Sequence, residues 1–293
     1  VREGRYADAV RLIRKDNPMP TACAYICEHP CEARCRRNMV DAPINIRGLK
    51  RYAVDHAGDV PNPPCEAATG KRIAIIGGGP SGLSCAYYLR LMGHAVTIFE
   101  EKKQLGGMLR YGIPAYRFPR EKLDAEIASI LSTGVEVHTG VTIGRDISFE
   151  QLHRDYDCLY VAIGAHTDKK TGIPGENSKN VMSAVEMLRA IGDDVMPDFT
   201  GKRVGVFGGG NGAMDVTRSS VRLGAASVTC VYRRRIEDMT ALPDEVQGAI
   251  AEGAEIRELC APVRIEANEA GEAAALWVQP QINGFADKSG RPR

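Results

Sequence analysis

Apolar and polar residues follow two different patterns along this chain. From about residue 71 onward, short apolar runs alternate with stretches of helical character, and Gly93 and Gly224 each end one of those stretches. Strand–helix alternation of this kind is typical of parallel sheets covered by helices. The pattern therefore predicts an α/β fold. The predicted strands are 72–76, 95–100, 135–139, 157–163, 204–207 and 227–232, and 157–163 is expected to be buried. The predicted helices are 81–92, 120–131, 213–223 and 245–252.

The first 60 residues carry no strand pattern. A helix is predicted over Tyr6–Lys15, where Asn17–Pro20 stops it, and a second helix over Ile46–His56. The prolines of Pro61–Pro64 cannot continue a helix and are typical of a linker. We therefore expect a small α-helical domain ahead of the α/β region. Beyond residue 253 we expect a further strand and then a weakly alternating, meander-like segment.

Two copies of one glycine pattern lie between a predicted strand and a predicted helix. In such a pattern the first glycine permits a tight turn, the second lets the backbone approach a pyrophosphate, and the third lets the helix pack on the strand. The helix N-terminus then faces the phosphates. A plain turn without a ligand is the alternative to each site. The pair predicts two dinucleotide sites, with candidate residues Gly77, Gly79, Pro80, Ser81 and Gly82 in the first and Gly208, Gly210, Asn211 and Ala213 in the second.

The residues at the ends of the following strands differ in charge. Glu100 ends the first strand, where an acid accepts hydrogen bonds from an adenosine ribose. When the strand ends are aligned, Arg233 takes the place of Glu100 in the second unit, and Arg234 follows it. A guanidinium binds a 2′-phosphate that a carboxylate would repel, so the second site is expected to prefer NADPH to NADH. A solvated basic turn is the alternative.

The composition argues against several classes of protein but does not indicate a particular function. Apolar residues make up 44% and charged residues 26% of the chain, and the net charge is +1, so nothing indicates a nucleic acid or an anionic membrane as partner. The apolar runs are shorter than the roughly 20 residues of a membrane helix. The first residues resemble neither a signal peptide nor an initiator start. We expect a cytoplasmic protein whose sequence continues beyond both ends.

Four cysteines recur at every fourth residue near the N-terminus: Cys23, Cys27, Cys31 and Cys35. Pro30 argues against one regular helix through them, and thiolates this close in a reducing compartment favour an iron–sulfur cluster. Zinc and no metal are the alternatives, although the paired spacing typical of zinc is absent. We interpret three further cysteines as buried small apolar residues: Cys85, Cys158 and Cys230.

At this point the motifs resemble a known family. The segments 27–37 and 43–46 resemble the cluster-binding region of glutamate synthase small subunits and their relatives. Those relatives include the amino-terminal half of dihydropyrimidine dehydrogenase and bifurcating NADH-dependent ferredoxin:NADP oxidoreductases. Residues 106–114 resemble the flavin-side loop of that family, and 206–216 with 231–235 resemble its NADPH domain.

The resemblance implies a helical [4Fe-4S] domain at 1–66, an FAD-binding domain at 67–190 and an NAD(P)H-binding domain at 191–293, each of them partial. Further candidate FAD-side residues are Gly107, Arg110 and Gly164. A plain turn is the alternative for Gly107, and a surface charge is the alternative for Arg110. Hydride would pass from NADPH to FAD, and single electrons would leave through the clusters, so no catalytic acid or base is required. Relatives carry further cysteines upstream, so the four cysteines here need not close one cluster.

The implied function is an oxidoreductase subunit that passes electrons between NADPH and a partner in a hetero-oligomer. The partner is a glutamate synthase large subunit or, as the alternative, a ferredoxin- or hydrogenase-type subunit of a bifurcating or transhydrogenase complex. A flavin disulfide reductase is less favoured, because Cys85 stands alone. A scaffold with vestigial cofactor sites is disfavoured by the intact glycines.

Overall fold

The computed structural model describes residues 1–286, and the last residues of the predicted NAD(P)H-binding domain, 287–293, lie outside them. The chain divides into two units, Val1–Ala165 and His166–Arg293. The three-domain division proposed from the sequence stays a prediction.

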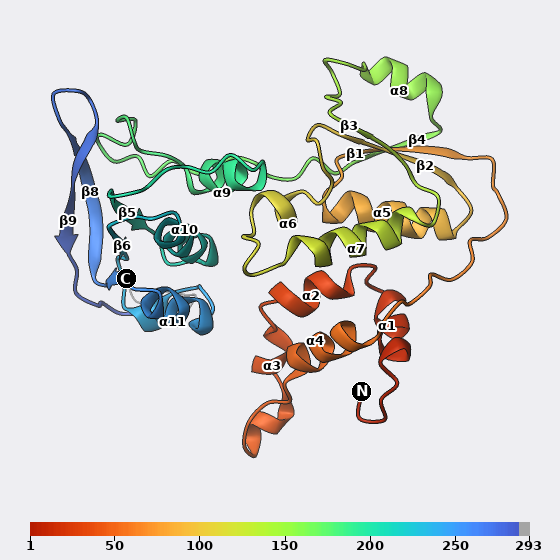
Figure 1. Cartoon of the computed structure of the whole chain (residues 1–293), viewed down its shortest axis with the longest axis horizontal. Helices are drawn as coiled ribbons and strands as arrows, with labels where there is room; N and C mark the ends of the chain where they lie inside the picture. Colours follow the sequence, from red (N-terminus) through yellow and green to blue (C-terminus); the bar gives the residue numbers. More distant parts are fainter. Residues whose placement is uncertain (287–293) are drawn as a thin grey trace. The chain divides into compact units, whose positions relative to one another are not determined.

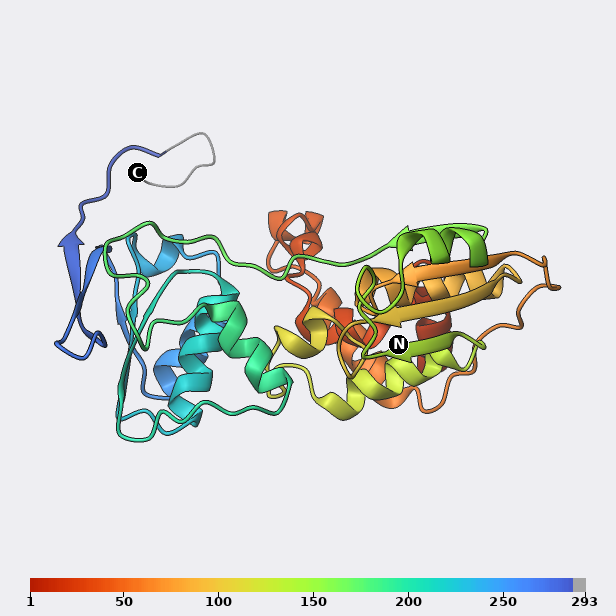
Figure 2. The same cartoon turned by 90° about the horizontal axis from the view of Figure 1, so that it is seen from above.

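The first unit contains a four-stranded sheet in the order β3-β2-β1-β4, and all its strand pairs are parallel. The helices α5 and α7 cover one face of the sheet and α8 covers the other (Figures 1 and 2). The strands are β1 (Arg72–Ile76), β2 (Ala95–Glu100), β3 (Glu136–Thr139) and β4 (Cys158–Val161), and the helices around them are α5 (Pro80–Leu91), α6 (Met108–Tyr111), α7 (Arg120–Leu131) and α8 (Phe149–Asp155).

The N-terminal helices pack onto this α/β core. Met19 and Ala22 join the same apolar cluster as Ile75 and Leu83. Glu126 of α7 is buried and accepts the backbone N–H groups of Thr21 at 2.6 Å and Ala22 at 2.9 Å, which caps a helix whose own N-cap residue offers no side-chain bond. Burial raises the pKa of Glu126. The elements of this region are α1 (Tyr6–Arg14), α2 (Pro20–Ile26), α3 (Pro30–Ala33), η1 (Arg36–Met39) and α4 (Ile46–His56).

The second unit repeats the strand–helix plan around a smaller parallel sheet in the order β5-β6-β7. Helices α9, α10 and α11 share one apolar cluster with Val206, Val228 and Cys230 of that sheet. An antiparallel hairpin of β8 and β9 follows. The bounds are α9 (Ala184–Gly192), β5 (Arg203–Phe207), α10 (Asn211–Arg222), β6 (Ser227–Val231), η2 (Ile236–Asp238), α11 (Pro243–Ala251), β7 (Glu255–Arg257), β8 (Cys260–Ala267) and β9 (Ala273–Pro280).

The predicted α/β fold, its parallel sheets and its helical N-terminal region are confirmed. One expectation about burial was wrong. The predicted buried strand 157–163 is the shorter β4, which lies at one edge of its sheet and is largely exposed. Cys158 on this strand is therefore exposed, whereas Cys230 is buried as predicted and Cys85 is half-buried. Within residues 1–286, no helix has the length and apolar character needed to cross a membrane.

Candidate dinucleotide-binding sites

The first glycine turn joins β1 to α5 and depends on its glycines. Gly77 has a φ of +109°, and a Cβ added there would lie 2.3 Å from the carbonyl oxygen of Ala162. A Cβ on Gly82 would lie 1.9 Å from the carbonyl oxygen of Gly77. Only hydrogen fits at these two places, so the turn and the helix that follows pack backbone against backbone.

Glu100 lies at the end of β2 beside this turn, and its side chain is buried. Its carboxylate accepts the N–H of Gly78 at 2.6 Å and the N–H of Lys102 at 2.8 Å. These two bonds fix the orientation of the carboxylate. A carboxylate has about four acceptor positions, so capacity remains for the hydroxyl groups of a ribose.

A second pair of glycines covers the first turn. The N–H of Gly106 donates to the carbonyl of Gly78 at 2.9 Å. Gly107 has a φ of +50°, and a Cβ on it would lie 2.7 Å from the Cα of Gly79. Gly79 and Gly107 thus face each other with backbone atoms alone, next to the N-terminal turn of α5. The first N–H groups of that helix have no intrahelical partner. This cradle fits the pyrophosphate of a dinucleotide such as FAD.

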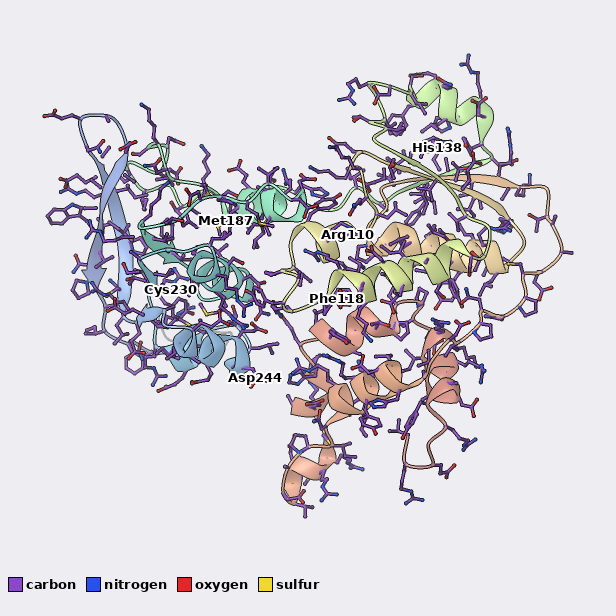
Figure 3. All side chains as sticks on the ribbon, viewed as in Figure 1. Arg110, Phe118, His138, Met187, Cys230 and Asp244 are labelled. Carbon is purple, nitrogen blue, oxygen red and sulfur yellow. The ribbon has the colours of Figure 1, made fainter. Side chains whose placement is uncertain are left out.

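Three other predicted residues lie around the first turn. Arg110 of α6, labelled in Figure 3, is buried. Its Nε donates to the carbonyl of Leu105 at 2.7 Å, and its guanidinium pairs with Asp124. Ser81 shares a hydrogen bond of 2.9 Å with the hydroxyl of Tyr160. Gly164 follows β4 with a φ of +69°. Arg110 therefore holds in place the loop of Gly106 and Gly107, which covers the first turn. Its contact with a flavin stays a prediction.

The second turn, between β5 and α10, is less tightly closed than the first. Gly208 has a φ of +146°, and a Cβ added there would lie 3.1 Å from the Cβ of Ala213. Alanine is therefore accommodated where the first turn requires Gly82. Gly209 faces the ring of Tyr232, because a Cβ on this glycine would lie 2.3 Å from a ring carbon.

The strand register corrects one prediction from the sequence. Ile76 pairs with Phe99 in the first sheet, and Phe207 pairs with Val231 in the second. The residue equivalent to Glu100 is therefore Tyr232, not Arg233. Counting from the first glycine of each turn agrees with the register: Glu100 lies 23 residues after Gly77 and Tyr232 lies 24 residues after Gly208, whereas Arg233 lies 25 residues after it.

Arg233 follows this tyrosine and differs from its neighbours in its contacts. Its side chain is exposed. Arg235, in contrast, pairs with Asp238 at 3.0 Å and with Glu237 at 3.0 Å. The Arg235 side chain holds the pKa of Asp238 below its ordinary value. Arg235 is thus engaged in local ion pairs, whereas the side chain of Arg233 is exposed to solvent.

A later segment covers the second turn, and the sequence analysis missed it. The N–H groups of Thr240 and Ala241 both donate to the carbonyl of Gly209 at 2.9 Å. The amide oxygen of Asn211 accepts the N–H of Leu242 at 2.9 Å. The sequence of this segment has the character of an ordinary loop, so only its contacts reveal its place over the turn. Asn211, predicted as a cofactor contact, holds this segment.

The four N-terminal cysteines lie in separate short elements. Cys23 is within α2, Cys27 ends it, Cys31 is in α3, and Cys35 precedes η1. The backbone N–H groups of Ile44 and Arg37 lower the pKa of the Cys35 thiol, and the Sγ of Cys27 accepts the N–H of His29 at 3.3 Å. N–H···S bonds of this kind suit thiolate ligands.

Within residues 1–286, however, no three Cys, His, Asp or Glu side chains are gathered closely enough to hold a metal ion. The thiol donors fit an iron–sulfur cluster by their chemistry, but in the described residues they are not gathered around one point. The assignment of Cys23, Cys27, Cys31 and Cys35 as ligands stays a prediction.

Comparison with known families agrees with this geometry. Residues 71–270 match the family described as pyridine nucleotide-disulphide oxidoreductase. Residues 1–60 match the family described as dihydropyrimidine dehydrogenase domain II, 4Fe-4S cluster. The first match contains both glycine turns, and the second contains all four cysteines. The family resemblance seen in the sequence is confirmed.

Individual relatives match the chain along its length. It is 38% identical to the NADP(+)-dependent formate dehydrogenase subunit beta of Moorella thermoacetica, with 100% of this chain and 45% of that protein covered. It is also 38% identical to the NADPH-Fe(3+) oxidoreductase subunit beta of Geobacter sulfurreducens, with the same coverage. The small chain of the NADPH glutamate synthase of Escherichia coli is 33% identical over 99% of this chain and 65% of its own length. The chain thus spans less than half the length of the first two.

Solved structures share the fold. Mycobacterium tuberculosis FprA in complex with NADPH aligns with a TM-score of 0.64 at 20% identity, over 76% of this chain and 66% of that one. The thioredoxin reductase of T. acidophilum aligns with a TM-score of 0.53 at 16% identity, over 76% and 73% of the two chains. Two Rossmann-like regions in one chain are therefore a known architecture.

Proposed function

Because the chain belongs to the pyridine nucleotide-disulphide oxidoreductase family, we propose that it is an oxidoreductase subunit that passes electrons between NADPH and a partner protein through FAD and [4Fe-4S] clusters. The observation that carries the proposal is the presence of two glycine turns that differ in the charge of a nearby residue. Glu100 stands beside the first turn, and Arg233 lies two residues beyond the end of β6, the strand that follows the second turn. An acid suits an unphosphorylated ribose, and an arginine suits a 2′-phosphate.

The residues of the first turn would bind and orient FAD. Gly79 and Gly107 leave room for the pyrophosphate, and Glu100 accepts hydrogen bonds from the ribose. The buried Arg110, paired with the exposed Asp124, keeps the loop of Gly106 and Gly107 in place. When bound, a flavin supplies the step between two-electron and one-electron chemistry that nicotinamide does not readily provide.

The residues of the second turn would bind NADPH. Gly210 leaves room for the pyrophosphate at the N-terminus of α10, and Arg233 with Arg234 would hold the 2′-phosphate. Their task is to hold the nucleotide in place, so no side chain is assigned as a catalytic acid or base.

A flavin disulfide reductase is the competing activity within the same family. That activity needs a reactive pair of cysteines beside the flavin. Cys85 is the cysteine within α5, it is half-buried, and burial raises the pKa of its thiol. A raised pKa keeps a thiol protonated and poorly nucleophilic. The protonated, half-buried thiol of Cys85 therefore favours another route by which electrons leave the flavin. The cysteines of the N-terminal region are the candidates for that route.

We propose that the partner is another subunit of a hetero-oligomeric, cytoplasmic complex. A glutamate synthase large subunit is one candidate. The alternative is a subunit of a dehydrogenase or electron-bifurcating complex, and the 38% identity to two beta subunits, against 33% to a glutamate synthase small chain, favours it. The chain that copurifies with the full-length protein would identify the partner.

Anaerobic mixing of the full-length protein with NADPH tests the proposal. We expect the visible absorbance of the flavin to bleach, because hydride transfer reduces the ring. Reduction by NADH should need a higher concentration, because NADH lacks the 2′-phosphate that Arg233 would bind. Purified protein with no flavin and no iron would contradict the proposal and favour a scaffold.

A further inference from the structure

The two glycine turns are each covered by a later loop through the same backbone atom. In the first turn the carbonyl of Gly78 accepts the N–H of Gly106 at 2.9 Å. In the second turn the carbonyl of Gly209, at the equivalent position, accepts the N–H groups of Thr240 and Ala241 at 2.9 Å. The two covering loops therefore occupy the same place relative to their turns.

The residue that each loop brings next to the turn differs. Gly107 of the first loop lies against Gly79 and presents only backbone. In the second loop the Oγ1 of Thr240 lies 3.5 Å from the place where a Cβ on Gly210 would be, and the side chain of Thr240 is exposed. A hydroxyl group thus stands beside the glycine where the pyrophosphate of a dinucleotide approaches the backbone.

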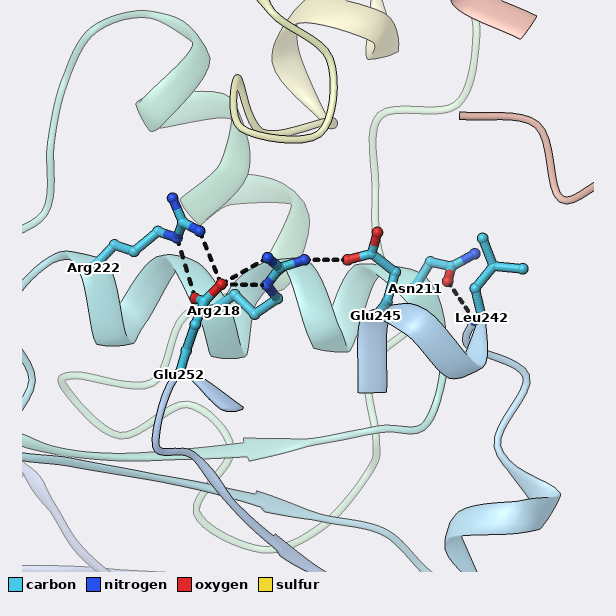
Figure 4. A network of polar contacts seen from close by, with 6 residues as sticks. All are labelled: Asn211, Arg218, Arg222, Leu242, Glu245 and Glu252. Carbon is cyan, nitrogen blue, oxygen red and sulfur yellow. Dashed lines mark hydrogen bonds and ion pairs between the residues drawn. The ribbon is translucent and has the colours of Figure 1, made fainter. Parts of the chain in front are cut away.

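The helix after this segment is fixed to α10 by ion pairs. Arg218 of α10 contacts Glu245 at 2.5 Å and Glu252 at 2.6 Å, and Arg222 adds a contact to Glu252 at 2.8 Å (Figure 4). The side chains of Arg218 and Glu245 are each 15% exposed, so this network is shielded from solvent. Ion pairs in such surroundings are screened less by salt than those on the surface.

The start of the same helix is fixed as well. Asn211, the first residue of α10, accepts the N–H of Leu242, which directly precedes α11 (Figure 4). A Cβ on Gly248 would lie 3.1 Å from the Cζ of Arg218, so the guanidinium packs closely on the backbone of α11. The segment that carries Thr240 is therefore held over the turn by contacts along the whole of α10.

We propose that Thr240 is an NADPH-binding residue whose hydroxyl donates a hydrogen bond to the pyrophosphate, and that Arg218 is the residue that positions it. The inference rests on the proposed function of the second turn. The Oγ1 of Thr240 lies 3.3 Å from the carbonyl of Gly209, which is a long hydrogen bond. A charged phosphate oxygen is a stronger acceptor, and a hydroxyl hydrogen rotates freely to reach it.

The test compares two ligands on the full-length, FAD-loaded protein. NADPH contains the pyrophosphate, whereas adenosine 2′-monophosphate contains only the 2′-phosphate end. Thr240→Val should weaken NADPH binding about tenfold, as expected for one hydrogen bond to a charged group, and should leave binding of the monophosphate unchanged. Thr240→Ser, which keeps the hydroxyl, should restore NADPH binding. Fluorescence titration measures the affinity of the wild-type protein and of both variants for each ligand.

The matched control is Thr200→Val. Thr200 is an exposed threonine that lies before β5, at the opposite end of the strand from the glycine turn. Its replacement should change the affinity for neither ligand. Arg218→Met should weaken NADPH binding through Thr240, so the losses in the double variant Arg218→Met/Thr240→Val should not add.

Several results would overturn the inference. NADPH binding by Thr240→Val at wild-type strength would exclude the hydrogen bond, and so would an equal loss for adenosine 2′-monophosphate. Additive losses in the double variant would exclude the positioning role of Arg218. A wild-type protein that binds neither ligand would overturn the proposed function and the inference with it, whereas wild-type binding with an unaffected Thr240→Val variant overturns the inference alone.

Discussion

The two glycine turns share a backbone and differ in what surrounds it. Each follows a parallel strand, contains a glycine of positive φ and begins a helix of 12 residues. The first turn packs closely against neighbouring backbone, and the buried carboxylate of Glu100 accepts one of its N–H groups. The second accommodates an alanine, faces a tyrosine ring and is followed by arginines. The comparison teaches that one backbone plan can be adapted to different ligands by changing one turn residue and the side chains around the turn.

The largest expected effect on stability is at the third glycine position of the pattern, which is Gly82 in the first turn and Ala213 in the second. Gly82→Ala should destabilise the first unit by about 3 kcal/mol, because its Cβ would lie 1.9 Å from the carbonyl oxygen of Gly77. Ala213→Gly, at the same place in the second turn, should cost only about 1 kcal/mol through helix propensity. Urea unfolding and the FAD content of both variants measure this difference. Equal losses would mean that the two turns are equally tight.

The next effect concerns the positive charge of Arg233, which follows the end of β6. Arg233→Ala should weaken NADPH binding about 10- to 100-fold and leave NADH binding unchanged, because only NADPH carries the 2′-phosphate. Arg235→Ala should have a smaller effect, because Arg235 is engaged with Asp238 and Glu237. Titration of each variant with both nucleotides measures the discrimination. The same loss for NADPH and NADH would show that Arg233 does not recognise the phosphate.

The ion network between α10 and α11 makes the second unit sensitive to acid. Arg222 and Arg218 lower the pKa of Glu252 from 4.5 to about 2. A group whose folded pKa is depressed stabilises the fold above its unfolded pKa, and that stability is lost as the pH falls toward its folded pKa. Stability should therefore decline between about pH 4.5 and 2, and Glu252→Gln should flatten that decline while costing on the order of 1–3 kcal/mol at pH 7.

Unfolding followed by circular dichroism across this pH range checks the prediction. Glu258→Gln is a suitable control, because the carboxylate of Glu258 accepts a backbone N–H in another part of the second unit. A pH dependence that is identical in wild-type protein and Glu252→Gln would contradict the account.

The smallest expected effect concerns the residue equivalent to the buried acid. Tyr232 donates its hydroxyl to the carbonyl of Asp238 at 2.9 Å, so Tyr232→Phe should cost about 1 kcal/mol of stability and little NADPH affinity. Glu100→Gln should instead release FAD. Thermal unfolding and cofactor content check this contrast. A large loss of NADPH binding in Tyr232→Phe would place the tyrosine in direct contact with the nucleotide.

Much of the fold could be predicted because continuous apolar runs define strands sharply. The predicted strands 72–76 and 95–100 coincide with β1 and β2, and the helix Ile46–His56 coincides with α4. The prediction of a buried strand at β4 was wrong, because its apolar residues look like those of a central strand and only the strand order places it at an edge.

The candidate sites were only partly predictable. Glycine spacing is local in sequence, so both turns could be found. The match of Arg233 to Glu100 was wrong because the match depends on strand register, which places Tyr232 there and which the apolar pattern does not show. Thr240 was missed because its place over the turn depends on tertiary contacts with Gly209. The burial of Arg110 could not be predicted for the same reason.

The central claim is that the two turns hold different dinucleotides, and one measurement tests it directly. Gly79→Val and Gly210→Val each fill the place where a pyrophosphate would approach the backbone of one turn. Bound FAD and NADPH affinity are then measured on both full-length variants. The account predicts that Gly79→Val loses FAD and that Gly210→Val keeps FAD but no longer binds NADPH. Loss of FAD from Gly210→Val, with FAD retained in Gly79→Val, would contradict it.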